Sequence, residues 1–312
     1  MTETTRRRAL RIGTRGSPLA LAQAHEVKRR LLDAHPTLVD ADIEVVPVST
    51  RGDRVQDRAL SELGGKGLFT EEIEAGLKDG SLDMAVHSMK DMPTIIEGGL
   101  GIVCLLPRED FRDAFISDRA DSLEALQAGS LVGTASLRRQ AQVLRRRPDL
   151  RVETFRGNVQ SRLRKLREGV ADATLLAMAG LRRLEMVEVA TSILDPETML
   201  PAIAQGAIGV ETRLDDDALL ALLAPLNHGV TETCITAERA FLAALDGSCR
   251  TPIAGLAVLD GDGIWLRGEI LTPDGRLHHA TERKGPASDA AAMGLDAGEE
   301  LRRRGGPDFF TG

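Results

Sequence analysis

Residues 10–34 read LRIGTRGSPLALAQAHEVKRRLLDA, and this stretch decides the class of the fold. Residues 10–14 have the pattern of a short strand. Ser17 then caps a helix that has Pro18 in its first turn and runs to about Ala34. A strand followed directly by a helix of this length is the unit from which α/β layers are built.

The same alternation continues along the chain. The predicted strands are residues 43–48, 83–86, 100–106, 114–117, 131–134, 151–155 and 173–177. The predicted helices are residues 70–78, 137–147 and 158–167. This order predicts α/β layers with largely parallel sheets, and the chain is expected to cross between two sets of layers near Pro107 and again between residues 201 and 209. Residues 50–67 are polar, carry glycines near both ends, and are predicted to form a mobile loop.

The last third of the chain has a different pattern. An amphipathic helix is predicted over residues 231–245, and a strand-like stretch over 253–271 is interrupted by the turn at 260–263. A further turn at 273–275 precedes an alanine-rich helix over 287–304. These elements predict a small α+β domain with an antiparallel sheet.

The charge of the chain is spread unevenly. The 312 residues include 47 acidic and 40 basic side chains, for a net charge of -7, and 34 of the basic residues are arginine. Between Arg138 and Arg183 there are twelve arginines and one lysine but only four acidic residues. Because the arginine fork matches carboxylate or phosphate oxygens, we expect this segment to bind something anionic. The alternative for part of it is a set of solvated helix faces. We assign that role to Arg145, Arg146, Arg147, Arg164 and Arg167.

Nucleic acid is the other anionic ligand to consider. Proteins that bind single strands or RNA usually place aromatic stacking platforms among their basic residues. This chain has no Tyr, one Trp and 3% aromatic residues, and Phe155 is the only aromatic residue in the basic segment. A compact polycarboxylate therefore fits better, and no nucleic-acid partner is predicted.

Composition also indicates the cellular setting. No stretch reaches the roughly 18 consecutive apolar residues of a membrane span. The basic start at Arg6, Arg7 and Arg8 has no apolar run behind it, and three cysteines cannot form a disulfide scaffold in a chain of this length. We therefore expect a cytoplasmic protein with no membrane partner. The six histidines lack metal-ligand spacing, so no metal site is predicted.

Cys249 is the cysteine with a setting for chemistry. It follows a helix end and the small residues Gly247 and Ser248, and it precedes Arg250, which favours an accessible thiolate. The alternative is an inert loop thiol. The other two cysteines, Cys104 and Cys234, are predicted to be small core residues.

A second candidate is His87-Ser88-Met89-Lys90-Asp91-Met92-Pro93. It follows a predicted strand, which is where α/β sheets place their ligand sites. Asp91 beside Lys90 would remain ionised and could stabilise a developing cation. The alternative is an aspartate that only orders the turn before the proline.

Taken in order, these stretches closely resemble the hydroxymethylbilane synthase family, also called porphobilinogen deaminase. The matching residues are 11–21 (RIGTRGSPLAL), 64–69 (GGKGLF), 87–93 (HSMKDMP), 133–140 (GTASLRRQ), 156–159 (RGNV), 200–207 (LPAIAQGA) and 247–249 (GSC). Seven matches in the family's order over nearly the whole chain are highly specific. Two departures are small, because Ser248 and Ala204 stand where glycine is common in the family.

The resemblance implies a transferase of tetrapyrrole biosynthesis. The family condenses four porphobilinogen molecules head to tail, releases four ammonia molecules, and then hydrolyses off hydroxymethylbilane. It works on a dipyrromethane cofactor held through a thioether on the cysteine that matches Cys249. The family's catalytic carboxylate matches Asp91, which is expected to hydrogen-bond pyrrole N–H groups and to stabilise the azafulvene cation left when ammonia departs.

The resemblance also implies the binding residues, since every porphobilinogen carries an acetate and a propionate. Those that match cofactor-binding positions, beside Cys249, are Lys90, Asp91, Ser136, Arg138 and Arg139. Those that match substrate-binding positions are Arg15, Ser17, Lys66, Arg156, Arg162, Arg183 and Gln205. The implied partner is porphobilinogen, with no metal, and the family is usually monomeric.

The implied fold is α/β with three domains. Two are α/β domains like those of periplasmic binding proteins, and the third is a small α+β C-terminal domain. Domain 1 is expected to comprise residues 4–106 and 207–226, and domain 2 residues 107–206. Domain 3, which carries the cofactor cysteine loop, is expected to comprise residues 227–312.

Two other functions remain open on the sequence. A carboxylate-binding module on the same two-lobed fold would use the arginines but would need neither Cys249 nor Asp91. An RNA-binding protein would use the basic segment and would show steeply salt-dependent binding. Release of ammonia from porphobilinogen distinguishes the synthase from both.

Overall fold

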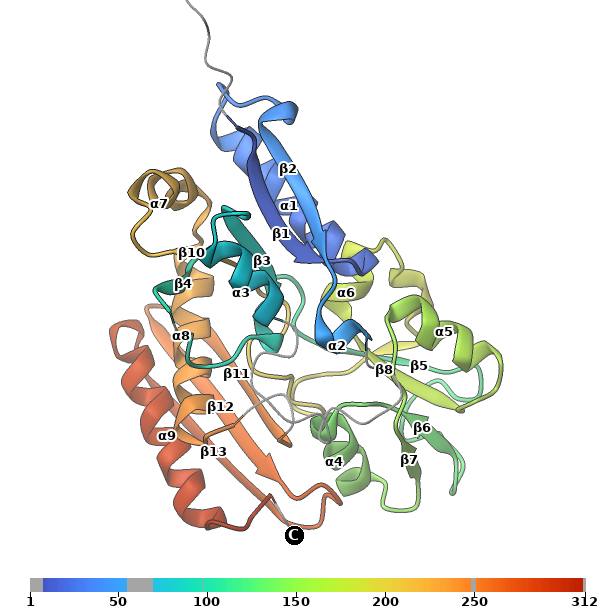
Figure 1. Cartoon of the computed structure of the whole chain (residues 1–312). Helices are drawn as coiled ribbons and strands as arrows, with labels where there is room; N and C mark the ends of the chain where they lie inside the picture. Colours follow the sequence, from blue (N-terminus) through green and yellow to red (C-terminus); the bar gives the residue numbers. More distant parts are fainter. Residues whose placement is uncertain (1–7, 55–69, 97, 248–250, 311–312) are drawn as a thin grey trace, which may run out of the picture.

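The structure is a computed structural model that describes residues 8–54, 70–96, 98–247 and 251–310 (Figure 1). Its strands are β1 (Leu10–Arg15), β2 (Ile43–Val48), β3 (Met84–Ser88), β4 (Leu100–Leu105), β5 (Asp113–Ile116), β6 (Leu131–Gly133), β7 (Arg151–Glu153), β8 (Ala173–Ala177), β9 (Ser192–Ile193), β10 (Ile208–Arg213), β11 (Ile253–Asp260), β12 (Gly263–Leu271) and β13 (His278–Pro286). Its α-helices are α1 (Pro18–Ala34), α2 (Arg51–Arg54), α3 (Glu71–Lys78), α4 (Leu137–Arg146), α5 (Val159–Arg167), α6 (Met178–Arg183), α7 (Asp217–Leu223), α8 (Gly229–Ala244) and α9 (Ala290–Gly305).

Two of the three sheets share one design. The first has the strand order β2-β1-β3-β10-β4, and the second has the order β7-β6-β8-β5-β9. In each sheet the first three strands are parallel, and the fourth strand is antiparallel to both of its neighbours. That fourth strand arrives from the other sheet, because β5 follows β4 along the chain and β10 follows β9.

The expectation of largely parallel sheets is wrong in this respect. Two of the four strand pairs in each five-stranded sheet are antiparallel. A parallel neighbour needs a crossover connection that returns the chain to the same end of the sheet. β5 and β10 come instead directly from the neighbouring sheet and enter from the opposite end, so their direction is reversed.

The two segments that join these sheets lie side by side. The N–H of Leu106 donates to the carbonyl oxygen of Ile208 at 3.1 Å, and the N–H of Glu109 donates to that of Gly206 at 3.2 Å. The chain therefore leaves the first sheet and returns to it through one hydrogen-bonded pair of segments.

The third sheet, β11-β12-β13, is an antiparallel meander that packs against α8 and α9 (Figure 1). Phe241 of α8 is fully buried in the apolar core between them. Gly268 of β12 permits this close packing, because a Cβ at that position would lie 2.5 Å from the Phe241 ring. The predicted α/β class with a small α+β part is confirmed. The residue limits of the three domains stay a prediction.

Most predicted elements agree with the structure to within a few residues, and two helix caps form as expected. The hydroxyl of Ser17 accepts a hydrogen bond from the N–H of Ala20 at 3.2 Å. Within the loop predicted over residues 50–67, α2 forms at the start, and residues 55–67 lie outside the described part of the chain. Cys104 and Cys234 are buried, as predicted.

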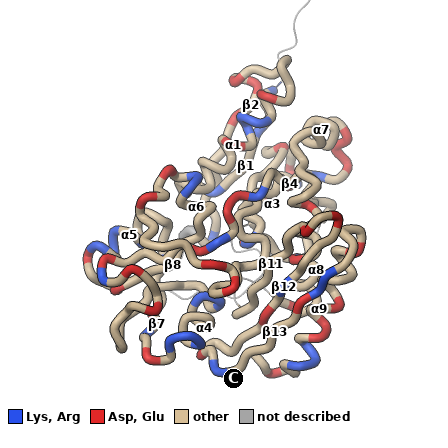
Figure 2. Tube along the Cα trace, turned by 180° about the vertical axis from the view of Figure 1, so that it is seen from behind, with Lys and Arg blue, Asp and Glu red and all other residues tan. Residues whose placement is uncertain are grey.

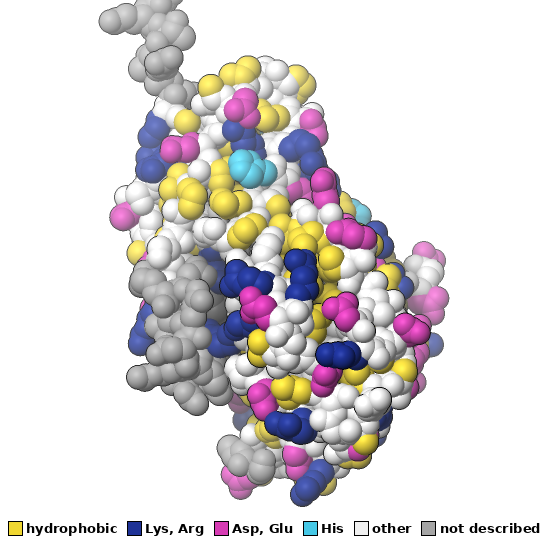
Figure 3. Space-filling view, turned by 90° about the vertical axis from the view of Figure 1, so that its right-hand side faces the viewer, with side chains coloured by type: hydrophobic (Ala, Val, Ile, Leu, Met, Phe, Trp, Pro, Cys, Tyr) yellow, Lys and Arg dark blue, Asp and Glu magenta, His cyan; other side chains and the backbone are white. Residues whose placement is uncertain are grey.

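The helix faces of the basic segment are mostly exposed, as expected. Figure 2 shows where the basic residues lie along α4 and α5. The exposed members are Arg145, Arg146, Arg164 and Arg167. The prediction is wrong for Arg147, whose guanidinium donates to three backbone carbonyls and pairs with Asp149 at 2.6 Å. On the face shown in Figure 3, basic and acidic side chains are interspersed.

Among the described residues, no single helix combines the length and apolar character needed to cross a membrane. One bent pair, Asp217–Leu226 with Gly229–Ala244, passes that test jointly by length and composition, with a bend of 105°.

Candidate active site

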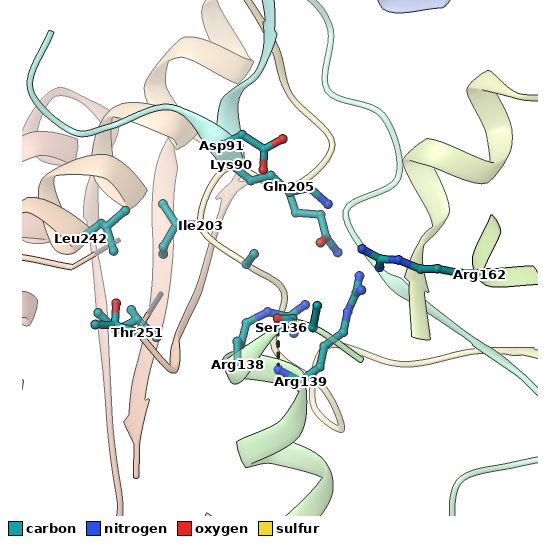
Figure 4. Close-up of a pocket in the computed structure, with 13 residues that line it drawn as sticks. Lys90, Asp91, Ser136, Arg138, Arg139, Arg162, Ile203, Gln205, Leu242 and Thr251 are labelled. Carbon is teal, nitrogen blue, oxygen red and sulfur yellow. Dashed lines mark hydrogen bonds between the residues drawn. The ribbon is translucent and has the colours of Figure 1, made fainter. Parts of the chain in front are cut away.

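A cavity of about 190 Å³ lies where the two five-stranded sheets and the C-terminal part meet (Figure 4). Its polar lining residues are Lys90, Asp91, Ser136, Arg138, Arg139, Arg162, Gln205 and Thr251. Its apolar lining residues are Ala135, Ala202, Ile203, Leu242 and Ile253. The cavity therefore gathers residues that are more than 160 positions apart in the sequence.

Lys90 and Asp91 reach the cavity from a 3-10 turn, η2 (Met89–Asp91), that directly follows β3. Met89 anchors this turn, because its side chain is buried and its N–H donates to the carbonyl oxygen of Ala207 at 3.0 Å. Since β3 is an inner strand paired with β1 and β10, the turn at its end is fixed to the sheet. Lys90 and Asp91 therefore follow a strand directly, as the sequence predicts.

The opposite wall of the cavity is the first turn of α4. Ser136 is the N-cap of this helix, and its Oγ accepts a hydrogen bond from the N–H of Arg139 at 3.4 Å. The side chains of Arg138 and Arg139 are buried beside it. Arg162 comes from α5, and Figure 4 shows its guanidinium directed toward that of Arg139.

Arg138 and Arg139 share one buried counterion, Asp113. Nη2 of each arginine donates to a different carboxylate oxygen of Asp113, and both distances are 2.7 Å. Burial alone would raise the pKa of Asp113, but the charges of the two arginines and their hydrogen bonds outweigh it and hold that pKa well below its usual value. Sequence reasoning missed Asp113. The available signal was an acidic residue at the start of an apolar strand, in a chain with an arginine-rich segment nearby.

Positive charge dominates the cavity. Lys90, Arg138, Arg139 and Arg162 line it, and Asp91 is the one acidic side chain in the lining formed by the described residues. Burial, and next the charge of Arg139, lowers the pKa of Lys90 to about 8. The same two causes lower the pKa of Arg162 to about 10. An anionic ligand would relieve the repulsion between these cations, so the cavity suits a polycarboxylate.

Gln205 lines the cavity from the segment that returns to the first sheet. Its side chain is buried, and Nε2 donates to the carbonyl oxygen of Phe111 and to Oδ1 of Asp113, both at 2.8 Å. Gln205 therefore joins the return segment to the carboxylate that holds the two arginines.

Four predicted binding residues are described but do not line the cavity. They are Arg15, Ser17, Arg156 and Arg183. Ser17 serves as the N-cap of α1. Arg183 forms an ion pair with Glu26 of α1 at 3.2 Å, which joins α6 to the first sheet's layer. Arg156 lies close enough to Arg162 for its charge to contribute to the lowered pKa of that residue.

Two predicted site residues, Lys66 and Cys249, lie outside the described residues. Thr251 lines the cavity, and it stands two positions after Cys249 in the chain. The apolar wall of Ile203, Leu242 and Ile253 was not predicted. Apolar residues in a helix, a strand and a connection look like ordinary core residues in a sequence, so no signal marked them.

Comparison with known proteins finds relatives along nearly the whole chain. A family model described as "Porphobilinogen deaminase, dipyromethane cofactor binding domain" matches residues 10–221, and one described as "Porphobilinogen deaminase, C-terminal domain" matches residues 232–303. A protein named porphobilinogen deaminase from Paracoccus denitrificans is 60% identical over 301 residues, which cover 96% of this chain and 96% of that protein. One of the same name from Nitrobacter hamburgensis is 56% identical over 300 residues, which cover 96% of this chain and 95% of that protein. Among solved structures, the methionine-binding protein MetQ matches with a TM-score of 0.45 and 12% identity over 76% of this chain and 94% of its own, a likeness too low to support a conclusion.

Proposed function

The chain belongs to the porphobilinogen deaminase family, and from this membership we propose that the cavity lined by Asp91 and Arg139 holds its cofactor and its substrate. The enzyme joins four porphobilinogen molecules head to tail with release of ammonia, and it releases hydroxymethylbilane by hydrolysis. It carries a dipyrromethane cofactor and serves tetrapyrrole biosynthesis. A carboxylate-binding module without catalysis is therefore not the function of this chain.

The lining residues fit a dipyrromethane. Its two rings carry four carboxylates, and the cavity presents the four cations Lys90, Arg138, Arg139 and Arg162. Nε of Arg138 and Nε of Arg139 are buried without a hydrogen-bond partner among the described residues, and we propose that a carboxylate oxygen of the cofactor satisfies them. We propose that Cys249 anchors the cofactor through a thioether, and the position of Thr251 in the cavity wall supports this.

Asp91 is proposed as the catalytic residue. When bound, the dipyrromethane would supply the free pyrrole carbon to which the first substrate unit is joined, and each later unit would join the terminal ring of the growing chain. Departure of ammonia leaves a positive charge on the pyrrole and methylene carbon of the substrate. The carboxylate of Asp91 stabilises that charge and accepts a hydrogen bond from the pyrrole N–H. Around it, the four cationic side chains neutralise the acetate and propionate groups, so the substrate's own carboxylates do not compete for the developing cation.

One observation carries this proposal. A single carboxylate, Asp91, stands among four cationic side chains in the cavity lining formed by the described residues. A site that only bound a polycarboxylate would gain nothing from a carboxylate of its own, because like charges repel. A site that must stabilise a cation formed on an anionic substrate needs one.

The remaining predicted binding residues are proposed to act on the growing chain. Each added ring brings two more carboxylates, so the carboxylates outnumber the four cations of the cavity from the third ring onward. Further basic side chains are then needed. We propose that Arg15, Lys66, Arg156 and Arg183 serve this purpose, that Ser17 contributes its hydroxyl to substrate binding, and that Gln205 contacts substrate at the cavity wall.

The proposal includes the setting of the enzyme. We propose a cytoplasmic monomer that uses no metal, membrane or nucleic-acid partner, with the three-domain limits given above. The burial of Arg138 and Arg139 and the ion pairs of exposed arginines, such as Arg164 with Glu168 at 3.8 Å, support the absence of a nucleic-acid surface.

The anchoring role of Cys249 is tested by intact-protein mass spectrometry. We expect the purified wild-type protein to exceed its sequence mass by two linked pyrrole units, and we expect Cys249→Ser to lack that mass and to release no ammonia from porphobilinogen. Cys234→Ser is the matched control, because this thiol is buried and we expect the added mass to remain. Wild-type protein that turns over fully at its bare sequence mass would exclude a tethered cofactor.

A further inference from the structure

We propose that Asp113 is a positioning residue for the reaction, which sets the guanidinium groups of Arg138 and Arg139 to receive the carboxylates of the bound pyrroles. Asp113 does not line the cavity, so it acts through the two arginines. The inference rests on the proposed function of the cavity. It adds Asp113 to the functional residues, although Asp113 lies behind the lining residues.

Each guanidinium is held at both of its terminal nitrogens. Nη2 of Arg138 and of Arg139 donates to Asp113, as described above. Nη1 of Arg138 donates to the carbonyl oxygen of Leu200 at 2.8 Å, and Nη1 of Arg139 donates to that of Leu175 at 2.8 Å. A planar group fixed at two points cannot turn in its plane, so the direction of its other N–H bonds is set as well.

The N–H groups left over are the ones that a ligand needs. A guanidinium has five N–H donors, and Nε of both arginines is buried without a partner among the described residues. A buried donor without an acceptor is costly, and an incoming carboxylate oxygen would remove that cost. The protein therefore binds both terminal nitrogens of each guanidinium and leaves Nε unpaired among the described residues.

The carboxylate also sets the charge of the pair. Asp113 is fully buried, and the two guanidiniums that meet on it would otherwise be neighbouring buried cations. With Asp113 in place the cluster has a net charge of +1, which remains attractive to an anion while the repulsion between the arginines is reduced.

The position of Asp113 links the arginines to the join between the two sheets. It is the first residue of β5, the strand that arrives from the first sheet, and Gln205 of the return segment donates to its Oδ1 at 2.8 Å. Both joining segments therefore contribute to the orientation of Arg138 and Arg139. The two arginines are correctly oriented only when the two sheets are correctly placed relative to each other.

Asp113→Asn tests the proposal. The asparagine keeps the shape but presents one acceptor and one NH₂ group, so it can hold one guanidinium while it turns donors toward the other. Asp110→Asn is the matched control. Asp110 is half-buried and is also paired with two arginines, Arg112 at 2.7 Å and Arg182 at 3.2 Å, but none of these residues lines the cavity.

We expect Asp113→Asn to lose a large part of the cofactor mass and to lower kcat/KM for porphobilinogen by about tenfold or more, mainly through a higher KM. We expect Asp110→Asn to keep the cofactor mass, kcat and KM of the wild type. Asp113→Asn with wild-type cofactor mass, kcat and KM would overturn the proposal.

A double-mutant cycle separates positioning from a general loss of stability. Arg139→Lys keeps the charge but cannot form the two-point contact, so Asp113→Asn should have a much smaller effect on KM in that background. Fully additive effects would contradict action through the arginines. If Asp113→Asn does not fold, Asp113→Glu retains the charge and moves the carboxylate by one methylene. A fully loaded Asp113→Glu variant with wild-type KM would then overturn the proposal. Wild-type protein without cofactor or turnover would contradict the proposed function instead.

Discussion

Among the cavity side chains, Lys90 has a charge that changes close to neutral pH. Burial and the nearby charge of Arg139 lower its pKa from 10.5 to about 8, while the charge of Asp91 acts in the opposite direction. The ammonium form can hold a carboxylate, and the neutral amine cannot. The neighbourhood that makes the cavity attractive to anions therefore also makes this charge sensitive to pH.

In protein that does not yet carry the cofactor, we expect loading of the dipyrromethane to weaken as the pH increases through about 8, because Lys90 then loses its proton. Lys90→Arg keeps its charge over this range and should remove the inflection from a plot of cofactor loading, measured by intact-protein mass, against pH. The weaker loading should not come from unfolding. Since the pKa of Lys90 is lower in the folded than in the unfolded chain, the unfolded state binds more protons between about pH 8 and 10.5, and the contribution of Lys90 to stability rises with pH in that window. An unchanged inflection in Lys90→Arg would assign the effect to another group.

Asp91→Asn tests the catalytic carboxylate without changing its shape. The amide cannot neutralise a cation, so we expect the rate of ammonia release from porphobilinogen to fall on the order of 100-fold or more, as when a preorganised group is removed from a transition state. The thermal midpoint and the circular dichroism spectrum should stay close to those of the wild type. A variant that retains more than about a tenth of wild-type turnover would argue against Asp91 in this role.

At the scale of elements, the active turn η2 depends on close packing against β10. Gly209 of β10 lies beside Met89, the buried residue that anchors η2. A Cβ at position 209 would lie 2.2 Å from the sulfur of Met89 and 3.1 Å from Ile102. The strand that arrives from the second sheet therefore determines where Lys90 and Asp91 stand.

We expect Gly209→Ala to destabilise the protein by about 1–3 kcal/mol, because an added methyl group overpacks a filled core. It should also lower kcat, since Met89 must move and η2 moves with it. Gly229→Ala is the control, because nothing lies within 4 Å of a Cβ at the start of α8. Urea unfolding and steady-state kinetics on both variants measure the two effects. Wild-type stability and kcat in Gly209→Ala would show that η2 tolerates a shift of Met89.

At the scale of the whole molecule, Glu238 of α8 connects the C-terminal part to the join between the two sheets. Its fully buried carboxylate accepts from Arg108 of the outgoing segment at 2.6 and 3.1 Å. It also accepts from the N–H of Ala204 in the return segment at 2.6 Å and from the N–H of Ala257 in β11 at 2.8 Å. Ala204 has a left-handed backbone with φ of 59°, which the hydrogen bond to Glu238 helps to hold.

We expect Glu238→Gln to lower the free energy of unfolding by about 3–5 kcal/mol, because Arg108 would be left buried without a counterion. Glu299→Gln is the control. Its exposed pairing with Arg303 at 4.0 Å should contribute less than about 1 kcal/mol. Thermal and urea unfolding of both variants measure the difference, and a Glu238→Gln protein as stable as Glu299→Gln would show that this junction does not hold the parts together.

Much of the fold follows from local sequence. The alternation of strands and helices up to residue 177, the caps at Ser17 and Ser136, and the hairpin of β11 and β12 all arise from side chains close together in the chain. β13 was not predicted as a strand. β10 was not predicted as a strand. Its residues 208–213 pair with β3 on one side and with β4 on the other, and both of these strands lie more than 100 positions earlier in the chain. No local sequence pattern indicates that pairing.

The chemistry of the candidate site was also readable in part. The order of seven short motifs indicated the family, and the residue types indicated a cationic cavity with one carboxylate. Tertiary structure alone decided that Lys90, Arg138 and Arg162 share a cavity, that Asp113 lies between two arginines, and that Arg183 pairs with Glu26. The physical reason is that charge, propensity and capping act over a few residues. Burial and counterion sharing depend instead on which distant segments come to lie within a few ångströms of each other.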